Sequence, residues 1–158
     1  MGTEKSHEYF MQLALKEALR AKEQNEVPIG ALLVINDQII CKAYNQVELM
    51  NDSTAHAEII ALTSAYHSLG SKYLPDASLY VTLEPCIMCA GAIFWGKIGT
   101  LVYGAADAKK GYSNFVLKNK SDEMNMEFPI LHPKTKVING ICQGECSKII
   151  QDFFKSKR

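Results

Sequence analysis

The sequence lacks a long apolar run, a leader-like N-terminus, internal repeats and a net charge. The longest uncharged window, residues 85–96, is too short to span a bilayer, so we expect no role in a membrane. The first residues contain no apolar h-region, so we expect no signal peptide and a cytoplasmic location. The absence of repeats and low-complexity segments excludes a solenoid or a fibrous protein.

Cysteine is scarce, with five in 158 residues. The odd number and the reducing compartment argue against a disulfide framework. A chain of this length buries a full core without disulfides, so we predict one domain over residues 1–158.

The charge balance is zero overall but uneven along the chain. Residues 1–106 carry 7 basic and 11 acidic side chains, whereas residues 107–158 carry 10 basic and 6 acidic ones. The C-terminal third is therefore predicted to contribute a basic surface, although a chance split of solvated charges is an equally good explanation of this pattern alone.

The apolar patterns and turn signals predict five strands interleaved with four helices. Helices are expected near residues 7–25, 55–69, 86–95 and 145–156, and strands near residues 29–35, 39–44, 78–83, 100–103 and 136–138. The strand–helix–strand order across residues 78–103 predicts a parallel pair of strands. The fold class is thus α/β, a three-layer α/β/α sandwich around a central five-stranded mixed sheet.

Several local details follow from residue type. Ser6 and Thr54 are predicted N-caps, and Gly70 and Gly96 are predicted helix ends. Residues 36–38 are predicted to form a hairpin turn, residues 46–53 a polar loop, and residues 118–127 a short helix or an insert. The second helix is expected to bury one apolar stripe, made of Ile59, Leu62, Tyr66 and Leu69.

Three residues have the chemistry and the spacing of a metal site. Cys86 and Cys89 lie three residues apart in the expected first turn of a helix, where the helix dipole favours thiolates. His56 lies in the first turn of the preceding helix. Two thiolates and one imidazole suit one Zn²⁺ per chain, with the fourth position left open for water, as in catalytic sites.

Glu58 follows His56 by two residues and is the predicted general acid–base for that water. Taken alone, the Cys-x-x-Cys pair has redox, structural and buried-core interpretations as well. The His-x-Glu pair together with Pro85 and the helix starts makes the catalytic metal site the better interpretation.

His-x-Glu followed by Pro-Cys-x-x-Cys is the known signature of zinc nucleobase deaminases. Residues 54–58 and 80–92 closely resemble the bacterial tRNA-specific adenosine deaminases, and residues 26–31 and 103–109 are also similar. The resemblance implies a cytidine deaminase-like fold. It also implies hydrolytic deamination of adenosine to inosine at the tRNA wobble position, by zinc-activated water with Glu58 as proton shuttle.

The resemblance also implies substrate contacts and partners. Ile29 matches an apolar residue that packs on the base, and Asn45 matches an asparagine that hydrogen-bonds the base. Asp107 matches an aspartate near the 2′-hydroxyl of the target ribose, a contact that distinguishes RNA from DNA. The basic C-terminal end matches the part that meets the tRNA anticodon arm, and the family implies a homodimer.

Two other functions stay open at this point. One is a zinc deaminase of a free base or nucleoside, such as guanine or cytosine, which would share the metal site but not the RNA contacts. The other is a non-catalytic zinc-containing RNA-binding module. Glu58 argues against the second alternative, because a binding module has no need of a proton shuttle.

Overall fold

A computed structural model describes residues 3–115 and 129–158. Its centre is a five-stranded sheet in the order β2-β1-β3-β4-β5, in which β1 is antiparallel to β2 and β3 while β4 is parallel to β3 and β5. The strands are β1 (Gly30–Ile35), β2 (Gln38–Tyr44), β3 (Ser78–Leu83), β4 (Thr100–Ala105) and β5 (Lys136–Asn139). The predicted parallel pair of β3 and β4 and the five-stranded mixed sheet are both confirmed.

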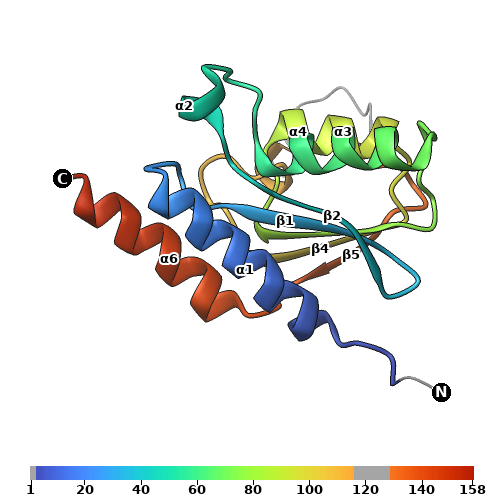
Figure 1. The fold of residues 1–158 in the computed structure, drawn as a ribbon, viewed down its shortest axis with the longest axis horizontal. Coiled ribbons are helices and arrows are strands. Elements are labelled where there is room, and N and C mark those ends of the chain that lie inside the picture. Colours follow the sequence, from blue (N-terminus) through green and yellow to red (C-terminus); the bar gives the residue numbers. More distant parts are fainter. Residues whose placement is uncertain (1–2, 116–128) are drawn as a thin grey trace, which may run out of the picture.

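Helices cover both faces of the sheet (Figure 1). The named helices are α1 (His7–Glu23), α2 (Val47–Met50), α3 (Ala57–Leu69), α4 (Ile87–Trp95) and α6 (Gln143–Ser156). Figure 1 shows α1 and α6 on one face and α3 and α4 on the other, which confirms the three-layer sandwich. None of the helices in the described ranges is long and apolar enough to cross a membrane.

The central strand β1 explains why two cores form. Its apolar residues alternate between the faces of the sheet: Ala31 and Leu33 pack with α3 and α4, whereas Leu32 and Val34 pack with α1. These four side chains are at most 4% exposed. A near-continuous apolar run is typical of a strand that is covered on both sides.

Two helix ends form as their residue types predict. The Ser6 hydroxyl accepts a hydrogen bond of 3.1 Å from the backbone N–H of Tyr9 and so caps α1. Gly70 follows α3 in the left-handed conformation, with φ of 61°, which costs glycine little.

The predicted N-cap of α3 was wrong. The helix begins at Ala57 with His56 at the N-cap position, and the Thr54 hydroxyl instead donates a hydrogen bond of 2.7 Å to Asp52. Thr54 has a local hydrogen-bond partner outside the helix, Asp52, two residues earlier in the chain, and this contact replaces the predicted helix cap.

Two connections also differ from the predictions. The hairpin turn contains two residues, Asn36 and Asp37, both with positive φ, as turns that match the strand twist require. The polar segment after β2 contains the one-turn helix α2. Residues 118–127 lie outside the described ranges.

Of the predicted apolar stripe of α3, Leu62 is buried and Tyr66 is half-buried against the core. The buried face consists mainly of alanines, namely Ala57, Ala61 and Ala65, while Leu69 is 40% exposed. Small side chains let the helix backbone lie close to the sheet, so the larger residues turn partly outward. Helix α6 also begins two residues before the predicted position, at Gln143.

Candidate metal centre and its neighbouring loops

Two helix N-termini bring three donor atoms together on the α3–α4 face of the sheet. Strand β3 ends at Leu83, Pro85 redirects the chain, and α4 begins with Cys86 at its N-cap and Cys89 in its first turn. His56 is the N-cap of α3. The sequence predicted His56 and Cys86 within the first turns of their helices. In the structure both residues are N-caps, directly before the first helical residue.

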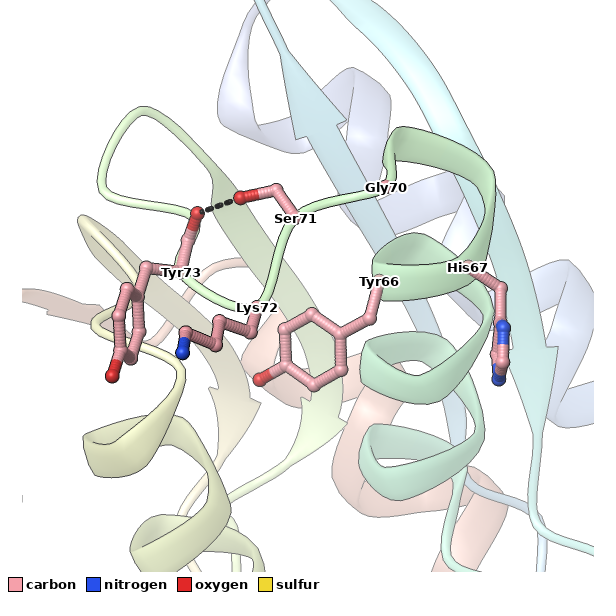
Figure 2. Close-up of a pocket in the computed structure, with 6 residues that line it drawn as sticks. All are labelled: Tyr66, His67, Gly70, Ser71, Lys72 and Tyr73. Atoms are coloured by element: carbon pink, nitrogen blue, oxygen red, sulfur yellow. Dashed lines mark hydrogen bonds between the residues drawn. The ribbon is translucent and has the colours of Figure 1, made fainter.

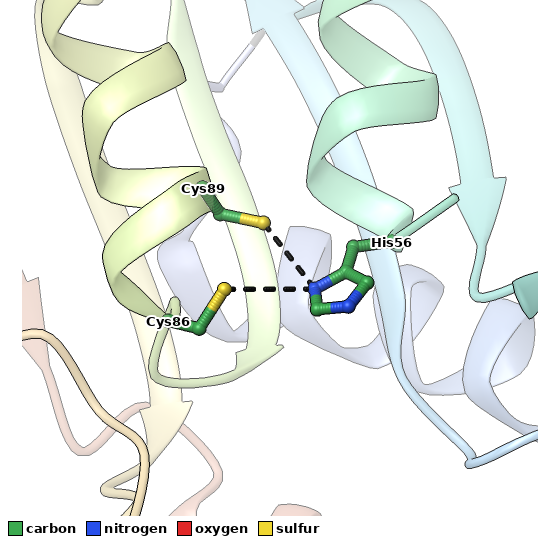
Figure 3. A group of neighbouring side chains, drawn as sticks. All are labelled: His56, Cys86 and Cys89. Atoms are coloured by element: carbon green, nitrogen blue, oxygen red, sulfur yellow. Dashed lines mark hydrogen bonds between the residues drawn. The ribbon is translucent and has the colours of Figure 1, made fainter. Parts of the chain in front are cut away.

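The distances between the three donors fit a single metal ion. His56 Nδ1 lies 3.6 Å from Cys86 Sγ and 3.5 Å from Cys89 Sγ (Figure 3). Tetrahedral zinc with bonds of about 2.3 Å to sulfur and about 2.05 Å to nitrogen separates such ligands by about 3.6 Å. The His56 nitrogen is thus already as far from each sulfur as in a zinc site.

The charges of the three donors depend on one another. The Cys86 thiolate accepts a hydrogen bond from the Cys89 thiol, which lowers the pKa of Cys86 to about 4 and raises that of Cys89. The hydrogen bond to Cys86 raises the pKa of His56. Both neighbours thus stabilise negative charge on the Cys86 sulfur, and the thiolate is the form of cysteine that binds a metal.

Glu58 lies beside this cluster and is the best candidate for a proton carrier. The residue is 3% exposed, and its Oε2 atom is buried with no hydrogen-bond partner in the described ranges. Burial raises the pKa of Glu58 to about 7. A buried carboxyl oxygen without a protein partner is suited to hydrogen-bond a small polar molecule, such as a water or a substrate amine.

The structure brings Ile29 and Asn45 together. The backbone N–H of Asn45 donates to the carbonyl of Ile29 at 3.0 Å, at the end of the β1–β2 hairpin. The side-chain amide of Asn45 is 4% exposed and donates to Glu26 Oε2 and to the carbonyl of Val27 at 3.5 and 3.4 Å.

Glu26 was missed by the sequence reasoning. It is 1% exposed, and its carboxylate accepts the backbone N–H groups of Glu48 and Leu49 at 3.2 and 2.6 Å. This buried carboxylate therefore binds the first turn of α2 to the segment that precedes β1. The available signal was the position of Glu26 directly before the apolar segment that starts with Val27-Pro28. A charged residue in such apolar surroundings is rarely buried unless it has hydrogen-bond partners.

Asp107 lies in the loop after β4, which contacts the start of α4. Its Oδ1 atom accepts the backbone N–H groups of Lys109 and Lys110, both at 3.0 Å. A short bridge pairs Cys86 with Gly111, so this loop lies directly beside one metal-site cysteine.

The other predicted features lie elsewhere. Cys41 donates to a backbone carbonyl, Cys146 is buried, and Cys142 is half-buried; neither of the last two belongs to the metal cluster. A surface hollow of about 580 Å³ lies at the C-terminal end of α3 (Figure 2). It is lined by Tyr66, His67, Gly70, Ser71, Lys72 and Tyr73, none of which was a predicted site residue.

Comparison with known proteins identifies the class first. Residues 5–158 match the family model of the MafB19-like deaminases, so the class of the protein is that of a deaminase. The tRNA-specific adenosine deaminase of Agrobacterium fabrum (strain C58 / ATCC 33970) is 43% identical over 150 residues, covering 95% of each chain. That of Buchnera aphidicola subsp. Schizaphis graminum (strain Sg) is 47% identical over 152 residues, again covering 95% of each. The chain belongs to the family of tRNA-specific adenosine deaminases.

Solved structures agree with this assignment. A structure from a study of A-to-I editing by tRNA:A34 deaminases matches with a TM-score of 0.78 and 43% identity, covering 89% of this chain and 98% of the other. The guanine deaminase of Bacillus subtilis matches with a TM-score of 0.64 and 34% identity, covering 75% of this chain and 78% of the other. The architecture is therefore shared by deaminases that act on different purines.

Proposed function

We propose that this protein hydrolyses the wobble adenosine of a tRNA to inosine and ammonia. The observation that carries the proposal is the cluster of His56, Cys86 and Cys89 beside the buried carboxyl of Glu58, whose Oε2 has no hydrogen-bond partner among the described residues. Relatives that are 40–47% identical over nearly the whole chain are named tRNA-specific adenosine deaminases, which favours tRNA as the substrate.

One Zn²⁺ per chain is the proposed cofactor, held by His56, Cys86 and Cys89. The donor set and the 3.5–3.6 Å spacing of its atoms support zinc over harder cations, which prefer oxygen ligands. When bound in such an open site, zinc lowers the pKa of a water molecule to roughly 7. Glu58 lies close enough to the Cys89 thiol to raise its pKa, and the buried Oε2 of Glu58 has no hydrogen-bond partner within residues 3–115 and 129–158.

Glu58 is the proposed catalytic acid and base. Its carboxylate takes a proton from the attacking water and delivers it to the departing amino nitrogen. The water oxygen bonds to C6 of the base, the C6–N6 bond breaks, and ammonia leaves. The raised pKa of Glu58, about 7, suits a group that must both accept and donate a proton near neutral pH.

Three residues are proposed to bind the target nucleoside. Ile29 is half-buried beside Asn45, and both lie at one end of the sheet. We assign base packing to Ile29, hydrogen bonding of the base to Asn45, and contact with the 2′-hydroxyl to Asp107. The Asn45 amide retains an oxygen for the base while its nitrogen is bound to Glu26.

The tRNA anticodon arm is the proposed partner of the C-terminal end. Lys155, Lys157 and Arg158 are all exposed, and Phe154 beside them is 49% exposed, whereas Phe153 is buried. In Figure 1 the C-terminus and α2 both lie toward the left of the molecule. Basic side chains next to an exposed aromatic ring suit a single-stranded RNA loop.

We also propose a homodimer. Helix α4 presents Trp95 and Ile87 at 75% and 42% exposure, next to a hollow of about 310 Å³ that Phe94 and Ile130 also line. Large exposed apolar residues beside a hollow suit a contact between two copies. Analytical ultracentrifugation at micromolar concentration tests this, with Trp95→Glu expected to yield monomers. A cytoplasmic location and a single domain over residues 1–158 stay predictions.

Deamination of free guanine is the second candidate. The 34% identity to a guanine deaminase over three quarters of the chain favours it. The higher identity and the coverage of 95% shared with tRNA-acting relatives favour the first.

Parallel assays on the two classes of substrate decide between the candidates. An anticodon stem-loop with a wobble adenosine is compared with free guanine, cytosine and adenine. We expect turnover of the stem-loop alone, one zinc per chain by metal analysis, and loss of nearly all turnover with retained zinc in Glu58→Ala. Turnover of guanine without turnover of the stem-loop would overturn the tRNA assignment.

A further inference from the structure

The loop that carries Asp107 is held from beneath by a buried carboxylate that has no role in the chemistry above. Glu84 is 3% exposed and lies between the end of β3 and Pro85. Its Oε2 accepts the backbone N–H of Asp107 at 2.9 Å, and its Oε1 accepts that of Ser113 at 3.0 Å. One carboxylate thus binds both sides of the loop, and each oxygen has one donor.

The remaining contacts of the loop point to the same strip of chain. The backbone N–H of Tyr112 donates to the carbonyl of Pro85 at 2.9 Å, and Gly111 pairs with Cys86. Asp107 closes the loop from inside, since its carbonyl accepts the N–H of Gly111 at 3.0 Å. The chain from Glu84 to Cys86 therefore serves as the base on which the loop is built.

The fit between Glu84 and the loop leaves no free space. A methyl group on Gly111 would meet the carboxylate of Glu84 and would lie 2.6 Å from the carbonyl oxygen of Asp107. Glycine at this position therefore lets the loop backbone approach the buried carboxylate. Glu84 and Gly111 thus form one close contact, with the carboxylate supplied by the segment after β3 and the glycine backbone supplied by the loop.

We propose that Glu84 is a positioning residue that sets substrate selectivity for ribose, by fixing the loop of residues 105–114 relative to the metal-site cysteine Cys86. This inference rests on the proposed function, in which Asp107 contacts the 2′-hydroxyl of the target ribose. Both carboxylate oxygens of Glu84 are occupied by backbone N–H groups of the loop. It couples the position of Asp107 to Cys86 because it precedes that cysteine by only two residues.

The main test variant is Glu84→Gln. Glutamine keeps the size of the side chain but offers one acceptor oxygen, while its NH₂ group faces a backbone N–H. Either Asp107 or Ser113 then loses its partner. Gly111→Ala is the second variant, which displaces the loop while the carboxylate stays. Glu17→Gln is the matched control, because Glu17 is also a buried glutamate, at 5% exposure, but pairs with Arg20 on α1.

The substrates are two anticodon stem-loops that differ only in carrying adenosine or 2′-deoxyadenosine at the wobble position. For Glu84→Gln we expect about a tenfold rise in KM on the ribose substrate, the effect of one lost charge-assisted hydrogen bond, with kcat little changed. The preference for ribose over deoxyribose should fall by a similar factor. Glu17→Gln should keep the wild-type KM and preference, and all variants should keep one zinc per chain.

Amide hydrogen exchange is the readout that does not depend on turnover. Glu84→Gln should accelerate exchange at Asp107 or Ser113, with little change in β3. Unchanged exchange would show that Glu84 does not hold the loop, and accelerated exchange with an unchanged ribose preference would show that loop position does not set selectivity. If Glu84→Gln fails to fold, Gly111→Ala decides by the same criteria. A wild-type enzyme that ignores both stem-loops overturns the proposed function itself.

Discussion

Glu26 offers the sharpest test of how the proposed base-binding end of the molecule is held together. The change is Glu26→Gln, which preserves shape but replaces one acceptor oxygen by an NH₂ group. The native carboxylate accepts three hydrogen bonds, from the backbones of Glu48 and Leu49 and from the Asn45 amide. In the variant, at least one of these donors loses its acceptor in a site where Glu26 is 1% exposed.

The expected cost follows from the kind of bond that is lost. A hydrogen bond to a charged group contributes about 1.5–3 kcal/mol, so we expect a loss of about 2 kcal/mol in the free energy of unfolding. For a domain of this size that corresponds to a fall in Tm of roughly 4–8 °C. The KM for the stem-loop should also rise, because Asn45 and α2 lose their common anchor.

The assay is urea unfolding of the zinc-loaded protein, with Glu23→Gln as the control. Glu23 is the exposed last residue of α1, three positions earlier, so its substitution should change stability by less than about 0.5 kcal/mol. If both variants unfolded at the wild-type midpoint, the buried carboxylate would contribute nothing, and the argument that it anchors α2 and Asn45 would be refuted.

Two further predictions concern packing and pH. In Gly30→Ala the new methyl group would lie 2.6 Å from the backbone nitrogen of Ala18 and closer still to the carbonyl oxygen of Ala14. Both atoms belong to the backbone of α1, which cannot move aside without breaking the helix. We expect the free energy of unfolding to fall by about 3 kcal/mol, with a lower Tm by calorimetry. Burial raises the pKa of Tyr80 to about 12, so unfolding releases its proton between pH 10 and 12 and stability falls as pH rises. At pH 11 the raised pKa of Tyr80 lowers the free energy of unfolding by about 1 kcal/mol. In urea titrations Tyr80→Phe should therefore lose less stability between pH 8 and 11 than the wild type does.

The order and the type of the main elements were predictable because their signals are local. Strand β1 is an apolar run flanked by proline and a turn, and α1 repeats apolar residues at helical spacing after a capping serine. The details that were wrong involve competition between neighbours or between packing arrangements. The Thr54 hydroxyl could hydrogen-bond either the N-terminus of α3 or Asp52, and it bonds Asp52. Which residues of α3 are buried depended on how closely that helix approaches the sheet.

The three residues of the candidate metal cluster were predictable for a different reason. Residue type and the Cys-x-x-Cys spacing limit what the side chains can do wherever the chain folds, and Cys86 and Cys89 share one helix turn. Glu26 and Glu84 were not predictable in their roles, since their partners lie 19 to 29 residues away in the sequence. Nothing in the local sequence states which backbone N–H groups a buried carboxylate will meet.

The sequence by itself therefore determined the chemistry, a histidine, two cysteines and a glutamate suited to zinc and proton transfer, because donor atoms and helix positions are local properties. Only the tertiary structure decided the geometry around that chemistry. It brought His56 to within 3.6 Å of both sulfurs and anchored the flanking loops on two buried carboxylates. These features depend on how distant segments pack, and packing is a property of the whole folded chain.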